Sequence, residues 1–235
     1  MFSEEAKETA KFYLLEDSLS HIDMLEALRR GSTDIIYAAS DGVVLHEKES
    51  ETCMISLKEI NRFHEVINPK KYSSFAVHQK KIAEWIQDKY HLPYHFEAYQ
   101  AAYRRKEAKE GIFDFIKELS EVHTQIIASH YTATEDVDYI KKLLERKQLW
   151  GLFEHGDLVG FIGEHLEGSM GLLEIFPPFR KKGHGYTLEA FLINRFLRLD
   201  RVPFCQVEKN NASSFSLQKK LGMEISKEAT WWLFQ

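Results

Sequence analysis

The sequence predicts an α/β fold of the mixed α+β kind, in which mainly antiparallel sheets are flanked by helices and two related halves follow one another. Three observations support this prediction. Apolar residues at helical spacing alternate with short apolar segments of strand length. Hairpin signals occur twice, at Asp41-Gly42 and at His155-Gly156-Asp157. The same order of expected helices and strands occurs around both hairpins. A chain of 235 residues is long enough for two domains of ordinary size.

The first half begins with a predicted helix over residues 4–30, where apolar residues recur every three or four positions before Gly31. Short apolar runs then predict a series of strands, and one further helical pattern lies between the last two of them. The expected strands are 34–40, 43–47, 52–57, 74–77 and 94–103, and the expected helix is 80–89.

The second half repeats this order after a charged segment without periodicity, residues 104–111. We therefore predict two domains, 1–108 and 109–235. Helices are expected over 122–130, 137–147, 186–199 and 212–221. Strands are expected over 149–154, 158–164, 170–176 and 203–207, and one or two closing strands over 223–234.

Charge and hydropathy argue against two classes of partner. Lys and Arg number 31 against 36 Asp and Glu, for a net charge of −5, and the basic residues are interleaved with acids. Such a chain lacks the cationic face that a nucleic-acid partner requires. No apolar run approaches the roughly 20 residues that span a bilayer, so we expect no membrane partner.

Cysteine and histidine usage argues against disulfides and metals. Cys53 and Cys205 form no CxxC pair, and the 11 histidines show no HExxH or His/Cys spacing of a zinc site. We expect no metal cofactor and no catalytic cysteine. The acidic amino terminus does not resemble a signal peptide, so the predicted location is cytoplasmic.

A glycine loop lies between an apolar strand and a helix. Its sequence is Arg180-Lys181-Lys182-Gly183-His184-Gly185, and it follows Pro177-Pro178. Such a loop can point backbone N–H groups outward at the positive end of a helix, which favours phosphate or pyrophosphate. The alternative is a glycine-rich turn whose cations are only solvated.

A second motif covers residues 207–223. Asn211 is a good N-cap, Leu217 and Leu221 form an apolar stripe, and Gly222 provides a helix stop. Taken alone, the segment is explained as a capped helix. The segment becomes informative about function because it comes after the glycine loop in the sequence, so that the two motifs occur together in one order.

Together the two motifs resemble the GNAT superfamily of acyl-CoA-dependent N-acyltransferases. Arg180-x-x-Gly183-x-Gly185 resembles the pyrophosphate-binding motif of that family, and the segment from Asn211 to Met223 resembles its second signature. The resemblance covers roughly residues 112–235 and is greatest to the FR47-like and glycine N-acyltransferase-like branch. The first half resembles a GNAT half that lacks the cofactor loop, with a role in packing or in closing the acceptor pocket.

The resemblance implies a set of cofactor-binding residues for acetyl-CoA or another acyl-CoA as co-substrate. It places the backbone of Ile175 and Phe176 beside the pantetheine arm, and Asn211 and Ser214 on the opposite wall. The pyrophosphate would lie on the loop and the helix start, at Arg180, Lys181, Lys182, Gly183, His184, Gly185 and Tyr186.

One position departs from the family pattern. Many members have a Tyr after the residue equivalent to Leu217, as general acid for the departing thiolate, and here that position is Gln218. A carboxamide cannot supply a phenolic proton. Either another donor acts, or none is required.

The implied reaction is transfer of an acyl group to a small-molecule primary amine by direct attack on the thioester. We expect Glu174 as general base, on the strand face opposite Leu173 and Ile175, with burial raising its pKa. Glu164 on the neighbouring strand is the reserve candidate. The alternative for Glu174 is a structural hydrogen bond or ion pair with the first half. The alternative function is a non-catalytic acyl-CoA-binding or regulatory module.

Overall fold

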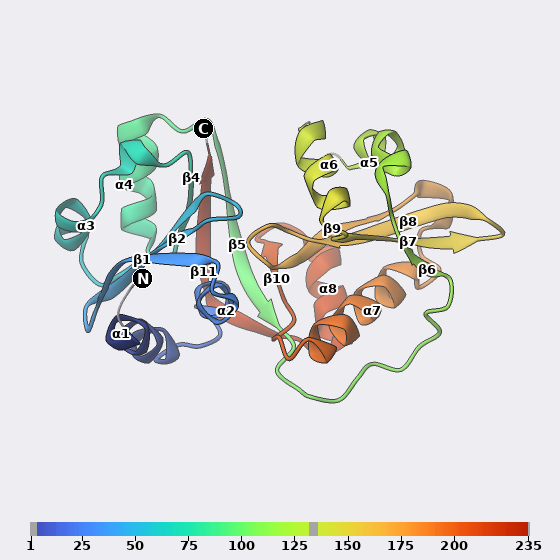
Figure 1. The fold of residues 1–235 in the computed structure, drawn as a ribbon, viewed down its shortest axis with the longest axis horizontal. Helices are drawn as coiled ribbons and strands as arrows, with labels where there is room; N and C mark the ends of the chain where they lie inside the picture. Colours follow the sequence, from blue (N-terminus) through green and yellow to red (C-terminus); the bar gives the residue numbers. More distant parts are fainter. Residues whose placement is uncertain (1–3, 132–135, 235) are drawn as a thin grey trace. The chain divides into compact units, whose positions relative to one another are not determined.

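The computed structural model describes residues 4–131 and 136–234. Within them the chain forms two compact units (Figure 1). The first contains residues 4–102, Gln206–Phe215 and 224–234, and the second contains Tyr103–Cys205 and Ser216–Met223. Because two late segments belong to the first unit, the units do not divide the chain at a single point. The assignment of 1–108 and 109–235 to two domains stays a prediction.

The elements of the first half of the chain follow a simple order. They are α1 (Glu4–Leu15), α2 (Ile22–Arg30), β1 (Thr33–Ala39), β2 (Gly42–Glu47), β3 (Thr52–Leu57), α3 (Ile60–Val66), β4 (Ser74–Val77), α4 (Lys80–Tyr90) and β5 (Tyr94–Ala102). A short 3₁₀ turn, Pro69–Lys71, precedes β4.

The second half begins with β6 (Ile116–Glu118) and then repeats this order. The repeated elements are α5 (Thr124–His130), α6 (Val137–Glu145), β7 (Leu149–Glu154), β8 (Asp157–Glu164), β9 (Met170–Ile175), α7 (His184–Arg198), β10 (Phe204–Glu208), α8 (Ala212–Leu221) and β11 (Glu224–Phe234). Two helices, three strands, and then helix, strand, helix, strand occur in each half. The predicted repeat of one α/β unit is therefore confirmed.

The prediction of one helix over 4–30 is wrong, because α1 and α2 are separated by a turn. Within that turn the Asp17 carboxylate accepts a hydrogen bond from the Ser20 backbone N–H at 3.2 Å. The His21 N–H donates to the Asp17 carbonyl at 3.1 Å. Apolar spacing continues across the turn because both helices cover the same sheet face, so periodicity alone could not reveal the break. The short elements α3 and β6 were not predicted.

A seven-stranded sheet in the order β1-β2-β3-β4-β11-β5-β10 organises the first unit. Strand β11 lies between β4 and β5 and is antiparallel to both, with Trp232 opposite Ala76 on one side and Phe96 on the other. The last strand of the chain is thus an internal strand of this sheet.

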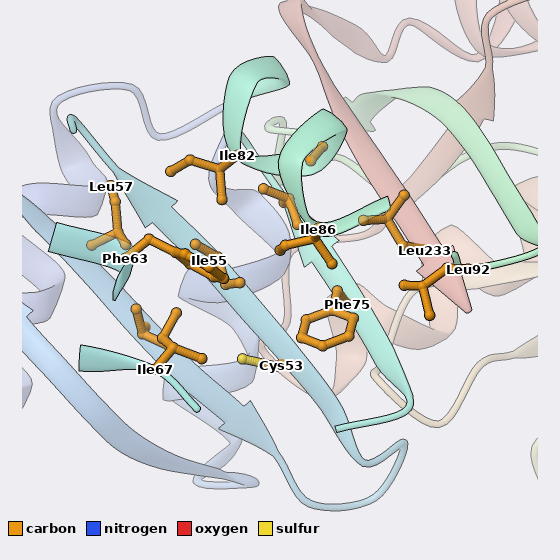
Figure 2. Packing of buried hydrophobic residues seen from close by; sticks show 13 residues of the cluster. Cys53, Ile55, Leu57, Phe63, Ile67, Phe75, Ile82, Ile86, Leu92 and Leu233 are labelled. Atoms are coloured by element: carbon orange, nitrogen blue, oxygen red, sulfur yellow. The ribbon is translucent and has the colours of Figure 1, made fainter. Parts of the chain in front are cut away.

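Both faces of this sheet are covered. Alternate residues of β2 and β3 point to opposite sides, so Val43 and Leu45 pack with α1 and α2, whereas Val44 packs with α3 and α4. Figure 2 shows the second of these cores, where Ile82 and Ile86 of α4 lie over the strands. Every residue of β3 is buried, as expected for a strand covered on both faces.

The second unit contains an antiparallel sheet in the order β6-β7-β8-β9. Helices α5 and α6 cover one face of it, and α7 covers the other (Figure 1). Leu172 and Phe161 point toward α5 and α6, where they join Ile127, Ile140 and Leu143 in one apolar cluster. Strand β9 is an edge of this sheet, so one side of its backbone has no neighbouring strand.

Candidate functional site

Strand β9 contains a β-bulge two residues before its end. Phe161 of β8 is opposite Glu174, and Gly163 is opposite Gly171, so Leu172 and Leu173 together face Ile162 alone. Leu172 has a φ of 52°, in the left-handed region that a leucine rarely adopts. Bulges of this kind interrupt the ladder and redirect the following residues. The end of β9 is therefore redirected at the point where the candidate loop begins.

The free edge of β9 presents Ile175. The Phe176 N–H donates to the Val159 carbonyl at 2.9 Å, on the β8 side of the strand. Backbone groups alternate between the two edges of a strand, so the N–H of Ile175 points to the open edge. Of the two strand residues predicted to lie beside the cofactor, only Ile175 offers its N–H there.

Arg180 ties the loop to this strand. Its Nε donates to the Ile175 carbonyl at 2.8 Å, and its Nη2 lies 2.8 Å from Oε1 of Glu174. The guanidinium charge is thus matched by a carboxylate within the same unit. Lys181 and Lys182 are exposed and carry the remaining positive charge of the loop, with Lys182 lying over the Phe179 ring.

Helix α7 starts without a side-chain cap. Its N-cap is Gly183, with a φ of 91°, and Lys181 before it also has a positive φ of 62°. At this turn the Thr187 N–H donates to the Gly183 carbonyl at 3.1 Å, which begins the helical hydrogen bonding. The N–H groups of His184, Gly185 and Tyr186 therefore precede the helical ladder, at the positive end of a 15-residue helix.

Gly185 faces three apolar side chains at this helix end. A Cβ built on it would lie 3.8 Å from Leu217 of α8, 3.9 Å from Leu173 and 4.0 Å from Ile175 of β9. These three apolar side chains are half-buried, so they form an open apolar lining beside the helix N-terminus. We call Gly185, Leu173, Ile175 and Leu217 the cradle. The methyl group of an alanine at position 185 would make ordinary van der Waals contact with these three side chains, and a larger side chain would enter the cradle.

Glu189 and Gln218 form a buried polar contact that was not predicted. Gln218 Nε2 donates to Glu189 Oε1 at 2.7 Å, with both side chains buried. Burial raises the pKa of Glu189 to about 7, partly offset by this hydrogen bond. The sequence contained a signal for this contact, because Glu189 is an acidic residue among the apolar positions of α7, four residues after Gly185.

The two predicted bases differ in surroundings. Glu174 lies on the face opposite Leu173 and Ile175, as predicted, but the expectation that it is buried is wrong. Its side chain is 22% exposed and paired with Arg180, because it lies one residue before the end of the edge strand β9. Glu164 is 10% exposed, and its Oε1 lies 2.6 Å from Nη1 of Arg201, within the second unit.

Asn211 and Ser214 belong to the first unit, at the start of α8. The Asn211 carboxamide accepts the Ser214 N–H at 3.0 Å and the Ser213 hydroxyl at 2.8 Å. The predicted N-cap is confirmed. Their predicted place on the opposite wall of the cofactor site stays a prediction.

His184 lies beside an acidic side chain, and both cysteines are buried. His184 Nε2 lies 3.1 Å from Oε1 of Glu154 on β7. Both cysteines are free and buried, and burial raises the pKa of each thiol far above its usual value. Among residues 4–131 and 136–234, no group of three or more His, Cys, Asp or Glu side chains could hold a metal ion.

The equivalent position in the first unit is closed. Only Lys58 and Glu59 separate β3 from α3, whereas residues 176–183 separate β9 from α7. The Gln79 carboxamide then bridges the strand ends, accepting the Leu57 N–H at 2.8 Å and donating to the Ser56 hydroxyl at 3.1 Å. The first half therefore has neither the loop nor an open strand edge at this point.

Comparison with protein families gives a match in the second half of the chain. Residues 150–233 match the family described as FR47-like protein, a range that contains β8, β9, the loop, α7, β10 and α8. No curated protein matches the chain. In the described part of the chain, no helix has the length and apolar character needed to cross a membrane.

Solved structures show the fold of the whole chain. A Drosophila protein is similar over 100% of this chain and 97% of its own, with a TM-score of 0.73 and 11% identity. A GCN5-related N-acetyltransferase-like protein from Streptococcus suis is similar over 98% and 99%, with a TM-score of 0.59 and 13% identity. A GNAT-family acetyltransferase from Colwellia psychrerythraea covers 93% and 98%, with a TM-score of 0.54 and 14% identity. The fold is therefore that of GNAT acetyltransferases, with mixed, mainly antiparallel sheets flanked by helices, as predicted.

Proposed function

Because the C-terminal half of this chain contains an FR47-like domain on a GNAT fold, we propose that the protein is an acyl-CoA-dependent N-acyltransferase. It transfers an acetyl or other acyl group to a small-molecule primary amine. The observation that carries the proposal is the uncapped start of α7 beside the cradle. A helix end of this kind suits a pyrophosphate, and the apolar lining suits a pantetheine arm.

The residues fit an acyl-CoA in two separate respects. The N–H groups of His184, Gly185 and Tyr186 face the position of an anion, and Lys181 and Lys182 add charge that no acidic side chain of the loop offsets. Gly185 keeps the space between α7, β9 and α8 open, since a Cβ there would enter it. When bound, the thioester supplies an activated acyl carbon for attack by the amine.

We place the oxyanion donor at the open edge of β9. The N–H of Ile175 points out of the sheet beside the cradle, and the bulge at Leu172 and Leu173 sets its direction. A backbone N–H fixed in this way stabilises charge that develops on the thioester carbonyl, without reorganisation during the reaction. Arg180 holds the same residue through its carbonyl.

For the general base we propose Glu174 rather than Glu164. Glu174 is partly exposed at the end of β9, next to Ile175, where it can exchange protons with solvent. Glu164 is enclosed with Arg201, and buried ion pairs of this kind serve structure. Asn211 and Ser214 remain proposed ligands from α8. The free cysteines favour a reducing, cytoplasmic location.

The alternative is an acyl-CoA-binding module without catalysis, which Gln218 favours because it cannot donate a proton. Release of free thiol from acetyl-CoA by the full chain, measured against a panel of small primary amines, separates the two. We expect amine-dependent release, and a fall of roughly 10²–10⁴-fold in Glu174→Gln with acetyl-CoA affinity retained. Binding of acetyl-CoA without release for any amine would favour the module, and unchanged turnover in Glu174→Gln would remove Glu174 as base.

A further inference from the structure

His130, the last residue of α5, lies on the ring of Phe176. Their ring centroids are 3.9 Å apart and the two ring planes are inclined by 24°, so the imidazole is stacked on the phenyl group. Phe176 is the first residue after β9 and directly follows Ile175, where we place the oxyanion donor. The imidazole therefore contacts the immediate neighbour of the residue at which acyl transfer is proposed to occur.

Phe176 is fixed by its own contacts. Its N–H donates to the Val159 carbonyl at 2.9 Å, and its carbonyl accepts from the Phe179 N–H at 2.8 Å. Its side chain is buried and packs with Ile127 of α5 in the apolar cluster of this unit. His130 follows Ile127 by three residues, so the two share one side of the helix. The cluster that fixes the strand end thus also sets the position of the imidazole.

The hydrogen bonds of His130 determine which ring nitrogen carries the proton. Nδ1 lies 2.9 Å from the Ile126 carbonyl oxygen, which can only accept, so Nδ1 donates. The Ser129 hydroxyl, 3.0 Å from the same nitrogen, already donates to that carbonyl at 2.9 Å. In the neutral ring the lone pair is therefore on Nε2. Within residues 4–131 and 136–234 no hydrogen bond involves Nε2, so this atom is available to accept a proton.

Glu174 lies on the same face of the sheet as the stacked rings. Phe161 of β8 is directly opposite Glu174, and its ring centroid lies 6.2 Å from that of Phe176. Residues directly opposite one another on antiparallel strands point to the same side. Two possible proton acceptors, the Glu174 carboxylate and the His130 imidazole, are thus present on one face at the end of β9.

Transfer to an amine requires more than one proton acceptor. An alkyl amine has a pKa near that of lysine, about 10.4, so near neutral pH it is almost entirely an ammonium ion without a lone pair. It loses one proton before it attacks the thioester, and a second proton as the new C–N bond becomes an amide. A single base such as Glu174 accounts for one of these two protons.

We propose that His130 is a further catalytic residue, whose Nε2 takes the first proton from the ammonium group of an alkyl amine. This inference rests on the proposed function. The N–H bond breaks, its electron pair stays on the amine nitrogen, and the imidazole becomes an imidazolium. The amine then forms the C–N bond, and Glu174 takes the second proton. As the C–S bond breaks, its electron pair stays on sulfur, which receives the imidazolium proton through solvent, and Glu174 releases its proton to solvent.

The test measures kcat/KM for acetyl-CoA and one alkyl amine, by release of free thiol from the full chain, near pH 7 and near pH 9.5. His130→Phe keeps a ring on Phe176 but has no proton acceptor, and His130→Gln is a second variant without one. Near pH 7 we expect both variants to be roughly 10²–10⁴-fold slower than wild type. Near pH 9.5 this loss should shrink at least about tenfold, because free amine accumulates as its pKa is approached.

His155→Asn is the control, since it removes an exposed imidazole from a turn whose φ of 52° asparagine adopts readily. It should match wild type at both pH values. Acetyl-CoA affinity and melting temperatures of the same samples show that each variant is folded. Turnover of either folded His130 variant that equals wild type near pH 7, or a loss that is the same at both pH values, would overturn this inference alone. Absence of thiol release by folded wild type with every amine would overturn the proposed function, and this inference with it.

Discussion

At the scale of single residues, the carboxylates of the second unit divide by their partners. Glu174 and Glu164 each face an arginine, so their charge is balanced in the folded protein. Glu189 accepts a hydrogen bond from the neutral Gln218, and burial raises its pKa to about 7. This residue therefore links folding to pH near neutrality.

The stability of the protein should fall as pH rises through this window. Glu189 binds its proton more tightly in the folded state than the ordinary value of 4.5 allows in the unfolded chain. Between pH 4.5 and about 7 the folded state holds more protons, so the free energy of unfolding decreases with pH, by roughly 3 kcal/mol in total. Glu189→Gln should abolish this decrease and be more stable than wild type at pH 8.

Urea unfolding of both proteins from pH 4.5 to 8 measures this effect. Glu145→Gln, an exposed change on α6, is the matched control and should keep the wild-type pH profile. A wild-type curve that runs parallel to that of Glu189→Gln over this range would show that Glu189 is ionised at no cost in the folded state.

Residues could be predicted from the sequence where their contacts lie within a few positions along the chain. Asn211 caps α8 through bonds to residues two and three positions away, so its sequence neighbours revealed it. Glu189 and Gln218 meet from different helices, 29 positions apart in sequence. Their pairing depends on how α7 and α8 pack, which the pattern of a single helix does not contain.

At the scale of elements, strand β11 shows the same limit. Its position in the chain was predicted from its apolar residues, but its insertion between β4 and β5 was not. Strand pairing across more than 120 residues depends on the whole sheet rather than on local propensity. The bulge in β9 could not be predicted either. Leu172 adopts a left-handed conformation, and leucine is not a residue type that indicates one.

Deletion of residues 224–234 should therefore prevent the first unit from folding. The deletion separates β4 from β5 and removes Trp232 and Leu233 from the two cores of the sheet. Loss of large core side chains costs about 3–5 kcal/mol each, comparable with the total stability of a domain. Circular dichroism and urea unfolding of the truncated chain should show no cooperative transition for this unit. A cooperative transition at wild-type urea concentration would show that β11 is dispensable.

At the scale of the whole molecule, one order of elements occurs twice, and the two copies differ at the connection that follows the third strand. After β9 the chain makes an eight-residue loop with Gly183 and then an uncapped helix, whereas after β3 it turns directly into α3. The first copy is closed there by Gln79. The sequence predicted this difference, because the glycine loop is a local feature. The same overall fold occurs at 11% identity in the Drosophila protein.

The central claim is that the second copy binds acyl-CoA at the start of α7. Titration of the full chain with acetyl-CoA by calorimetry tests it most directly, with Gly185→Val as the matched variant. Gly185 is helical, so valine is tolerated by the backbone, but its side chain would fill the cradle against Leu217, Leu173 and Ile175. We predict one site per chain with roughly micromolar affinity for wild type, and affinity at least about tenfold weaker for Gly185→Val at unchanged melting temperature. Folded wild-type protein that binds no acetyl-CoA, or equal binding by both proteins, would contradict the account.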